Sequence, residues 1–200
     1  MIWKTENILE KINPQKTRLI MFDLDGTLVD SVPDLAFAVD LMLQTLGKPV
    51  AVQDKVRHWV GNGAGMLVKR ALSNNMTPED LDESLYQEGY GLFLKYYQQV
   101  NGTKSQLYPN VLETLIQLRN TFPYLALITN KPEQFTQPLL YHHLLPKFDL
   151  VVCGDTLPTK KPDPAQLLYC LEKLGCSAEE ALMVGDSVSD IKAAKAAQVP

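Results

Sequence analysis

Short apolar runs recur along the chain and predict the strands of a sheet. These runs lie at Leu19–Phe22, 124–128, 148–153 and 181–184. Runs of this length, bounded by polar residues, are typical of strands buried on both faces of a parallel sheet. Segments with a helical pattern lie before, between and after the last three runs, at 111–118, 133–145, 164–174 and 188–197. The alternation predicts an α/β fold with a Rossmann-like, doubly wound parallel sheet and right-handed crossovers.

The stretch from residue 31 to 103 has a different pattern, because apolar residues recur at helical spacing there and no strand pattern is convincing. Its first helix has an apolar face formed by Leu35, Val39, Met42 and Leu46. Further helices are predicted over 54–59, over 64–72 and from Thr77 onwards, with Ser31 and Thr77 as N-caps. We therefore expect an all-helical domain, residues 31–103, inserted into an α/β core of residues 1–30 and 104–200.

Composition and charge narrow the class of partner. The net charge is −4 and no basic run stands out, so we expect no nucleic-acid partner. The apolar runs are too short to span a membrane, and the N-terminus lacks the pattern of a signal peptide. Cys153, Cys170 and Cys176 are odd in number and lack metal-ligand spacing, which favours a reducing compartment. We expect a cytoplasmic protein, monomeric or dimeric.

Candidate chemistry begins where the first strand ends, in Asp23-Leu24-Asp25-Gly26-Thr27. Residues two apart on a strand point the same way, so Asp23 and Asp25 can face one site at the sheet edge where α/β proteins bind ligands. Two adjacent carboxylates repel each other unless a cation lies between them, and Mg²⁺ prefers such oxygen ligands. The pair indicates a carboxylate nucleophile beside a proton-transferring acid. A plain turn after a strand is the alternative interpretation.

Polar residues also follow the second and third predicted strands. Thr129 and Asn130 offer a hydroxyl, an amide and backbone N–H groups to phosphate oxygens, although this pair is also common as a helix cap. Lys161 precedes a Pro-x-Pro turn whose stiff backbone would fix its ammonium near the aspartates. Lys160 is interpreted as a solvated surface charge.

The fourth predicted strand ends in Gly185-Asp186, and Asp190 follows one helical turn later. Asp186 lies at the same predicted sheet edge as Asp23, and Asp190 can face the same ion. A helix-capping role for Asp186 is the alternative, and the two roles can coexist.

These motifs, in this order, resemble those of the haloacid dehalogenase superfamily in its phosphatase branch. Phe22-Asp-Leu-Asp-Gly-Thr-Leu28 is similar to the first motif, Thr129 to the second, Lys161 to the third and Gly185-Asp-x-x-x-Asp190 to the fourth. The resemblance implies that Asp23 is the nucleophile, which forms an aspartyl-phosphate, and that Asp25 is the general acid/base. It also implies a Mg²⁺ cofactor held by Asp23, the Asp25 backbone carbonyl, Asp186 and Asp190. The phosphate would be held by Gly26, Thr27, Thr129, Asn130 and Lys161.

Within the helical block, Val56-Arg-His-Trp-Val-Gly-Asn-Gly-Ala64 resembles the cap segment of phosphoglycolate phosphatases. Its turn, Gly61-Asn62-Gly63, would bring backbone N–H groups to a substrate carboxylate, with Arg57 or Lys69 as charged assistants. A plain helix connection is the alternative interpretation of the glycines. The resemblance favours a Mg²⁺-dependent phosphatase of small phosphorylated acids or sugars, with 2-phosphoglycolate as the first choice.

The residues also bear on other functions known in the superfamily. A haloalkanoate dehalogenase normally lacks the second aspartate, so Asp25 argues against it, and a phosphate-binding regulator would be expected to lack a catalytic residue. A sugar-phosphate phosphatase or phosphomutase shares the core, although Gly185 stands where the mutases typically have Glu. Family members continue after Ala-Gln-Val-Pro200 with another strand. We therefore expect the last core strand to be absent, 181–184 to be an unprotected edge, and a truncated, inactive member to be a further alternative.

Overall fold

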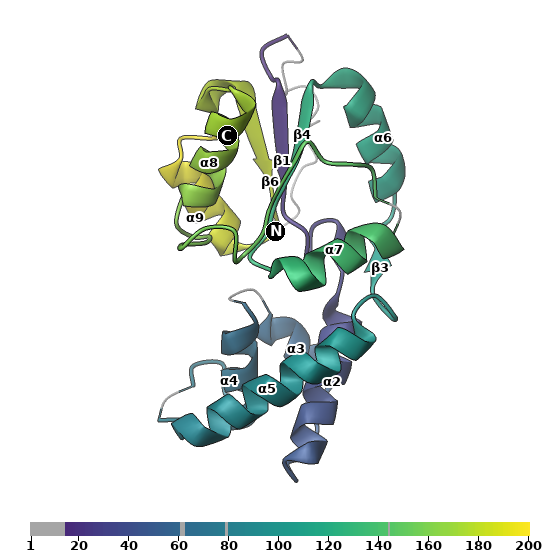
Figure 1. Ribbon diagram of the computed structural model, residues 1–200, viewed down its shortest axis with the longest axis vertical. Coiled ribbons are helices and arrows are strands. Elements are labelled where there is room, and N and C mark those ends of the chain that lie inside the picture. Colours follow the sequence, from purple (N-terminus) through teal and green to yellow (C-terminus); the bar gives the residue numbers. More distant parts are fainter. Residues whose placement is uncertain (1–14, 61–62, 79, 144) are drawn as a thin grey trace, which may run out of the picture.

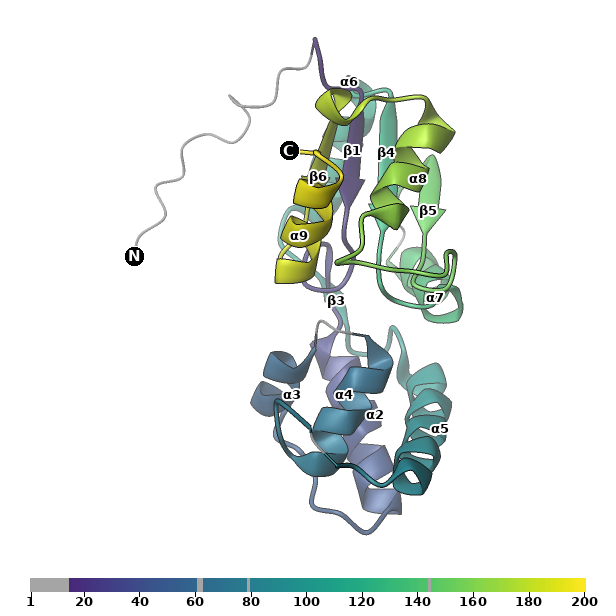
Figure 2. The ribbon, with the colours of Figure 1, turned by 90° about the vertical axis from the view of Figure 1, so that its left-hand side faces the viewer.

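The computed structural model describes residues 15–60, 63–78, 80–143 and 145–200. It has two parts stacked along the long axis, an α/β part and a helical part (Figure 1). The second view, at 90° to the first, shows the same division (Figure 2). Among the described helices, none combines the length and apolar character that a membrane span requires.

The core sheet has four parallel strands in the described residues. They are β1 (Leu19–Phe22), β4 (Tyr124–Ile128), β5 (Leu150–Val152) and β6 (Ala181–Val184). Their order is β5-β4-β1-β6, so β1 lies inside the sheet, with Leu19 opposite Tyr124 on one side and Ala181 on the other. All four residues of β1 are buried, which explains its uninterrupted apolar sequence.

Helices cover both faces of this sheet, as the alternation predicts. They are α6 (Val111–Thr121), α7 (Glu133–His142), α8 (Ala165–Leu174), α9 (Val188–Ala196) and the short 3₁₀ helix η1 (Ala178–Glu180). Leu19 and Met21 pack in a cluster with residues of α8 and α9, whereas Ile20 and Phe22 pack with residues of α6 and α7. Alternate residues of β1 therefore serve opposite faces, and the doubly wound α/β fold is confirmed.

The inserted part consists of α2 (Val32–Thr45), α3 (Gln53–Trp59), α4 (Ala64–Ser73) and α5 (Glu83–Val100). Its own apolar core includes Phe93 and Tyr97, and Phe135 of α7 joins this cluster from the α/β part. Ser31 is the N-cap residue of α2, as predicted, but its hydroxyl donates to Asp25 and not to a helix N–H. The predicted cap at Thr77 is wrong. The fourth helix begins at Glu83 and not at Thr77, because the Asp82 carboxylate accepts the Leu85 N–H at 2.8 Å and caps it there.

The two connections between the parts run side by side. β2 (Val29–Asp30) leads into the helical part, β3 (Gln106–Leu107) leads back, and the two strands pair antiparallel. Asp34, in the first turn of α2, is fully buried. Its carboxylate accepts hydrogen bonds from the returning connection, namely from the N–H groups of Gly102, Lys104 and Ser105 at 2.7–3.1 Å and from the Thr103 hydroxyl at 3.2 Å.

β6 is an edge strand among the described residues, where it pairs with β1 alone. The residues after α9 nevertheless return to it, because the Met183 N–H donates to the Pro200 carbonyl at 2.9 Å. The free edge of β6 is thus already contacted at one position.

Candidate active site

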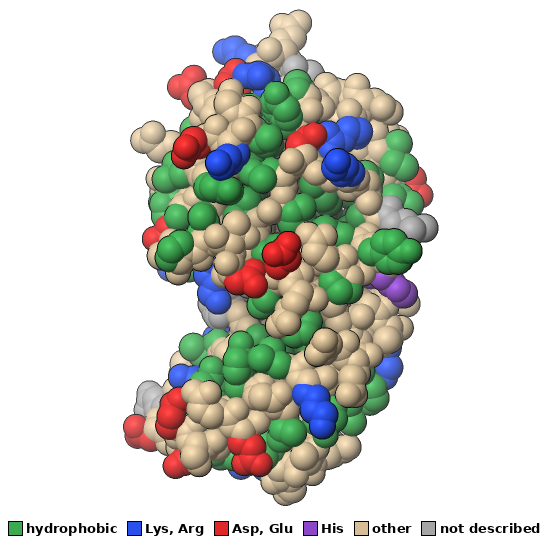
Figure 3. Space-filling model, in the orientation of Figure 1, with side chains coloured by type: hydrophobic (Ala, Val, Ile, Leu, Met, Phe, Trp, Pro, Cys, Tyr) green, Lys and Arg blue, Asp and Glu red, His purple; other side chains and the backbone are tan. Residues whose placement is uncertain are grey.

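A cavity of about 490 Å³ lies between the carboxyl ends of the core strands and the helical part. That volume is in the range of small-molecule sites, roughly 300–1,000 Å³. The space-filling view shows the surface hollowed at the boundary between the two parts (Figure 3). Asp23, Thr129 and Asp186, which follow β1, β4 and β6, line the cavity, and Leu67, Phe93 and Tyr97 line it from the helical part.

The chain leaves β1 in a tight turn that presents both predicted aspartates to the cavity. Asp23 is buried and still bound to the sheet, since its N–H donates to the Val184 carbonyl. Gly26 has φ +93°, and a Cβ there would collide with the Asp186 carboxylate. Glycine is required at this position on both counts. Asp23, Asp25, Gly26 and Asp186 all line one cavity, as the motif spacing predicts.

Lys161 is the centre of the charge network. Its buried ammonium donates to Asp23 Oδ1 at 2.8 Å, to Asp190 Oδ1 at 2.6 Å and to the Ile128 carbonyl at 2.7 Å. Burial raises the pKa of Asp23 to about 7, and the neighbouring Lys161 charge limits that rise. Lys160, one residue earlier, is exposed, although its Nζ lies only 3.1 Å from where a Cβ on Gly63 would stand.

Oxygen ligands for a cation gather at this edge. Asp23, Asp186 and Asp190 each offer a carboxylate oxygen, and these atoms lie within 4.8 Å of one another. Both oxygens of Asp190 are already bonded, Oδ1 to Lys161 and Oδ2 to the N–H and hydroxyl of Ser187 in a capping box. Thr27 does not line this cavity, and its hydroxyl donates to Asp186 Oδ1 at 2.9 Å. The donor set suits a hard divalent ion. Burial raises the pKa of Asp186, and the hydrogen bond from Thr27 opposes that rise.

The strand end after β4 holds the predicted phosphate-binding pair. Thr129 and Asn130 both line the cavity. The Asn130 amide donates to the Lys161 carbonyl at 2.8 Å and so joins two of the motifs. Gln166, which the sequence did not single out, is fully buried and donates to the Thr129 and Cys153 carbonyls while accepting the Lys161 N–H.

Sequence reasoning missed the partners of Asp25. Lys131 is buried, and its ammonium lies 3.0 and 3.2 Å from the two oxygens of Asp25, while the Ser31 hydroxyl donates to Asp25 Oδ1 at 2.5 Å. Burial alone would lower the pKa of Lys131, but the Asp25 charge beside it raises the pKa above its ordinary value. The sequence does carry one signal for Lys131, because this lysine directly follows Thr129-Asn130 at a strand end that is predicted to be part of the site.

Of the residues predicted to bind the substrate from the helical part, some line the cavity and others do not. Arg57 lines the cavity and makes a bidentate ion pair with Asp30, at 3.1 and 2.9 Å, and Gly63 also lines it. Gly61 and Asn62 lie outside the described residues. Lys69 does not line the cavity, because its ammonium lies over the Tyr86 ring, 4.7 Å from the centroid.

Comparison with known proteins agrees with this geometry. Residues 20–200 match the family model described as haloacid dehalogenase-like hydrolase. A phosphoglycolate phosphatase of Pseudomonas syringae pv. syringae is 52% identical over 183 residues, which cover 91% of this chain and 67% of that protein. One from Nitrosococcus oceani is 48% identical over 92% of this chain and 81% of its own length. A crystal structure of a predicted phosphoglycolate phosphatase from Haemophilus somnus 129pt superposes with a TM-score of 0.83 at 39% identity, covering 92% of this chain and 83% of that one. The chain belongs to the haloacid dehalogenase-like hydrolases.

Proposed function

We propose that this protein hydrolyses the phosphate monoester of a small metabolite, with 2-phosphoglycolate as its preferred substrate. The observation that carries the proposal is the convergence of Asp23, Asp25, Lys161 and Asp186 at one sheet edge, beneath a cavity that the helical part covers. Relatives that share about half of the sequence are named phosphoglycolate phosphatases, which supports this choice of substrate.

In the proposed reaction a carboxylate oxygen of Asp23 attacks phosphorus, and the bond from phosphorus to the ester oxygen breaks. Asp25 gives its proton to the leaving alkoxide, which departs as the alcohol. A water then attacks the phosphorus of the aspartyl-phosphate and passes a proton to Asp25. The bond between phosphorus and the Asp23 oxygen breaks, so inorganic phosphate and free Asp23 are released. The buried Lys161 ammonium offsets the negative charge that gathers on the phosphoryl oxygens.

The acidic residues suit Mg²⁺. Asp23 and Asp186 would hold the ion together with the Asp25 backbone carbonyl, and Asp190 would contribute directly or through a water. Among the described contacts, the second oxygens of Asp23 and Asp186 receive no hydrogen bond from another residue. When bound, Mg²⁺ supplies positive charge that permits a phosphate dianion beside several carboxylates. The phosphate itself would lie against Thr129 and Asn130, which line the cavity between these groups.

The helical part sets the size of the leaving group. The cavity is closed on the side of the helical part by Leu35, Leu67 and Phe93, so the leaving group must be small. A covered site also excludes competing water. This argues for small phosphorylated acids over phosphoproteins.

The test measures phosphate release from 2-phosphoglycolate, sugar phosphates and nucleotides, with Mg²⁺ and with EDTA. We expect Mg²⁺-dependent turnover with the highest kcat/KM for 2-phosphoglycolate. Asp23→Asn should abolish turnover while the protein stays folded, whereas Asp40→Asn, on the outer part of α2, should not. Preference for another ester would discard the substrate, and substantial turnover by Asp23→Asn would discard the mechanism.

A further inference from the structure

We propose that Lys131 and Tyr97 form a subsite that binds a carboxylate on the leaving group of the substrate. This inference rests on the proposed phosphatase function and names the residues that would select an acidic ester over a neutral one. It differs from the expectation that the turn at 61–63, with Arg57 or Lys69, would do so.

The three basic side chains that line the cavity in the described residues have different partners. Lys161 directs its donors at Asp23, Asp190 and a backbone carbonyl, so it is fully engaged with the reacting edge. Arg57 is paired at both ends of its guanidinium with Asp30, at a partly exposed position. The buried Lys131 has two ion-pair contacts, both to Asp25, and an ammonium carries three donors. Its remaining donor lies on the side of the neutral Tyr97 and is not paired with a second anion among the described residues.

Tyr97 supplies an independent indication that this part of the cavity binds an acceptor group. Its side chain is 2% exposed, it lines the cavity from α5, and its O–H has no acceptor among the described residues. The Lys131 ammonium interacts with the Tyr97 oxygen but can only donate. Burial raises the pKa of Tyr97 to about 12, so the hydroxyl keeps its proton and is a donor at neutral pH. A buried donor without an acceptor is costly, and an acceptor on the substrate would satisfy it.

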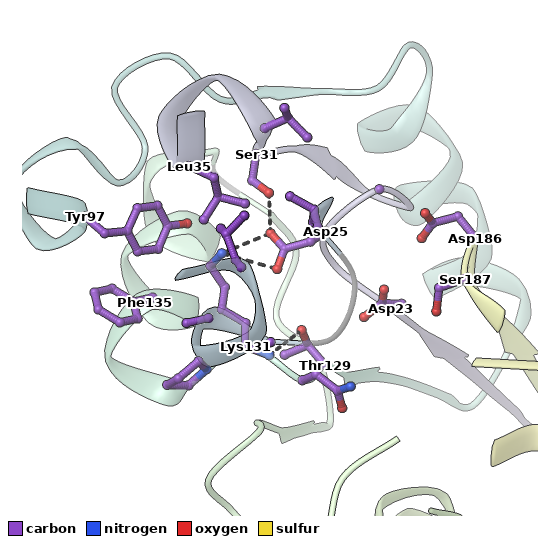
Figure 4. A pocket seen from close by; sticks show the side chains of 18 of the residues that line it. Asp23, Asp25, Ser31, Leu35, Tyr97, Thr129, Lys131, Phe135, Asp186 and Ser187 are labelled. Carbon is purple, nitrogen blue, oxygen red and sulfur yellow. Dashed lines mark hydrogen bonds and ion pairs between the residues drawn. The ribbon is translucent and has the colours of Figure 1, made fainter. Parts of the chain in front are cut away.

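The two donors lie together on one side of Asp25. The Lys131 ammonium is 4.9 Å from the centre of the Tyr97 ring. Figure 4 shows Lys131 between Tyr97 and Asp25, with Asp23, Asp186 and Ser187 on the far side of Asp25. A phosphate at Asp23 would thus have its leaving group directed past Asp25 towards this pair of donors, between the apolar walls formed by Leu35 and Phe135.

The chemistry of 2-phosphoglycolate fits this order of groups. Asp25 must contact the ester oxygen to protonate it, and one methylene separates that oxygen from the carboxylate. Standard bond lengths then place a carboxylate oxygen roughly 3 Å from the ester oxygen. The Lys131 ammonium, which already contacts Asp25, is therefore within reach of one oxygen of the substrate carboxylate. The other oxygen of that carboxylate can accept a hydrogen bond from Tyr97.

The subsite also joins the two parts of the molecule. Lys131 belongs to the core, directly after β4, and Tyr97 belongs to α5 of the helical part. A carboxylate bound by both would hold the helical part down on the core, so recognition of the acid would favour the covered state of the site.

The test compares two esters that differ only in this group, 2-phosphoglycolate and 2-hydroxyethyl phosphate, in Tyr97→Phe and Lys131→Met. We expect each substitution to lower the ratio of kcat/KM values, acid over neutral ester, by roughly 10- to 100-fold, the range for a hydrogen bond to a charged group. Tyr96→Phe is the matched control, because Tyr96 bonds Thr45 on the surface, and it should leave the ratio unchanged. Equal losses for both esters in both variants would refute the subsite.

A binding measurement separates this proposal from the proposed function. In the Asp23→Asn background, calorimetry with Mg²⁺ should show that Tyr97→Phe weakens 2-phosphoglycolate about tenfold and weakens 2-hydroxyethyl phosphate, whose hydroxyl is a neutral acceptor, much less. If the wild-type protein hydrolyses neither ester, the proposed function fails, and this titration still decides the subsite. Unchanged affinity for 2-phosphoglycolate in both variants would overturn it. Tyr97→Phe retains the Asp25 ion pair, so it decides the matter even if Lys131→Met does not fold.

Discussion

The buried carboxylate of Asp34 offers the sharpest test of how the helical part is attached. It accepts three backbone N–H groups, from Gly102, Lys104 and Ser105, which belong to the connection that returns to the core. Asp34→Asn keeps the shape but replaces one acceptor oxygen with a donor amide. One orientation of this amide keeps the bonds from Gly102 and Ser105 and turns its NH₂ towards the Lys104 N–H.

The expected cost follows from these contacts. A buried N–H left without an acceptor costs about 1–3 kcal/mol, and two bonds that lose their charge assistance each weaken by about 1 kcal/mol. The sum is roughly 3–5 kcal/mol, a large share of the 5–15 kcal/mol typical of a folded domain. With a urea m-value of about 2 kcal/mol/M, the unfolding midpoint should fall by roughly 1.5–2.5 M.

Urea unfolding followed by circular dichroism measures this shift, and hydrogen exchange at Gly102, Lys104 and Ser105 locates it. Asp40→Asn is the matched control on the same helix, because the partly exposed Asp40 accepts one N–H, from Ala51, and should cost under about 1 kcal/mol. If Asp34→Asn is no more destabilising than Asp40→Asn, the reasoning from buried charge-assisted bonds is wrong.

Four further predictions concern the site and the buried thiol of Cys170. Because burial raises the pKa of Asp23 to about 7, a cation must displace a proton at lower pH, so the apparent Mg²⁺ affinity should fall about tenfold per pH unit below 7; equal affinities by calorimetry at pH 6 and pH 8 would contradict this. A salt-bridged aspartate has a lowered pKa, whereas the pKa of Asp23 is raised. Asp23 should therefore make the metal-free protein less stable as the pH rises from about 4 to about 7, and urea unfolding midpoints across that window would record this loss. Gly26→Ala should lower kcat at least about tenfold and cost about 1–2 kcal/mol or more, whereas Gly47→Ala, at φ +65° with open space around it, should cost the backbone strain alone and keep kcat; equal kcat values in the two variants would show that the collision with Asp186 is harmless. Burial raises the pKa of Cys170 to about 12, so its alkylation by iodoacetamide at pH 8 should be over about 100-fold slower in the native than in the urea-unfolded protein, as peptide mass spectrometry would measure.

The sequence predicts the core well because the core obeys local rules. Each strand is buried on both faces, so its sequence is an apolar run, and parallel strands bring their carboxyl ends to one edge. Asp23, Thr129, Lys161 and Asp186 each follow a separate strand or turn, and the sheet alone is enough to gather them. The expected helical insertion rests on equally local helical spacing, and the structure contains the helices.

What the sequence could not predict depends on which face of a helix meets which neighbour. Lys69 follows Leu67 by two residues, about 200° around the helix, so it points away from the cavity that Leu67 lines. The helical spacing of α5 does not single out Tyr97, and only the docking of α5 against the core brings it to Lys131. The hydroxyl of Ser31 had two possible partners, a helix N–H and Asp25, and the turn after β1 decided between them.

The paired strands β2 and β3 place the entry and exit of the helical part in register, with Asp30 opposite Gln106. Seen from the core, the whole helical part is the loop of a β-hairpin. Such a loop can be exchanged without touching the parallel sheet, and a two-residue Asn-Gly turn is enough to close a hairpin of this kind. Under the proposed function, substrate choice would therefore be modular in this architecture: the sheet edge with its aspartates would stay constant, while the length and sequence of one hairpin loop would decide which esters reach it.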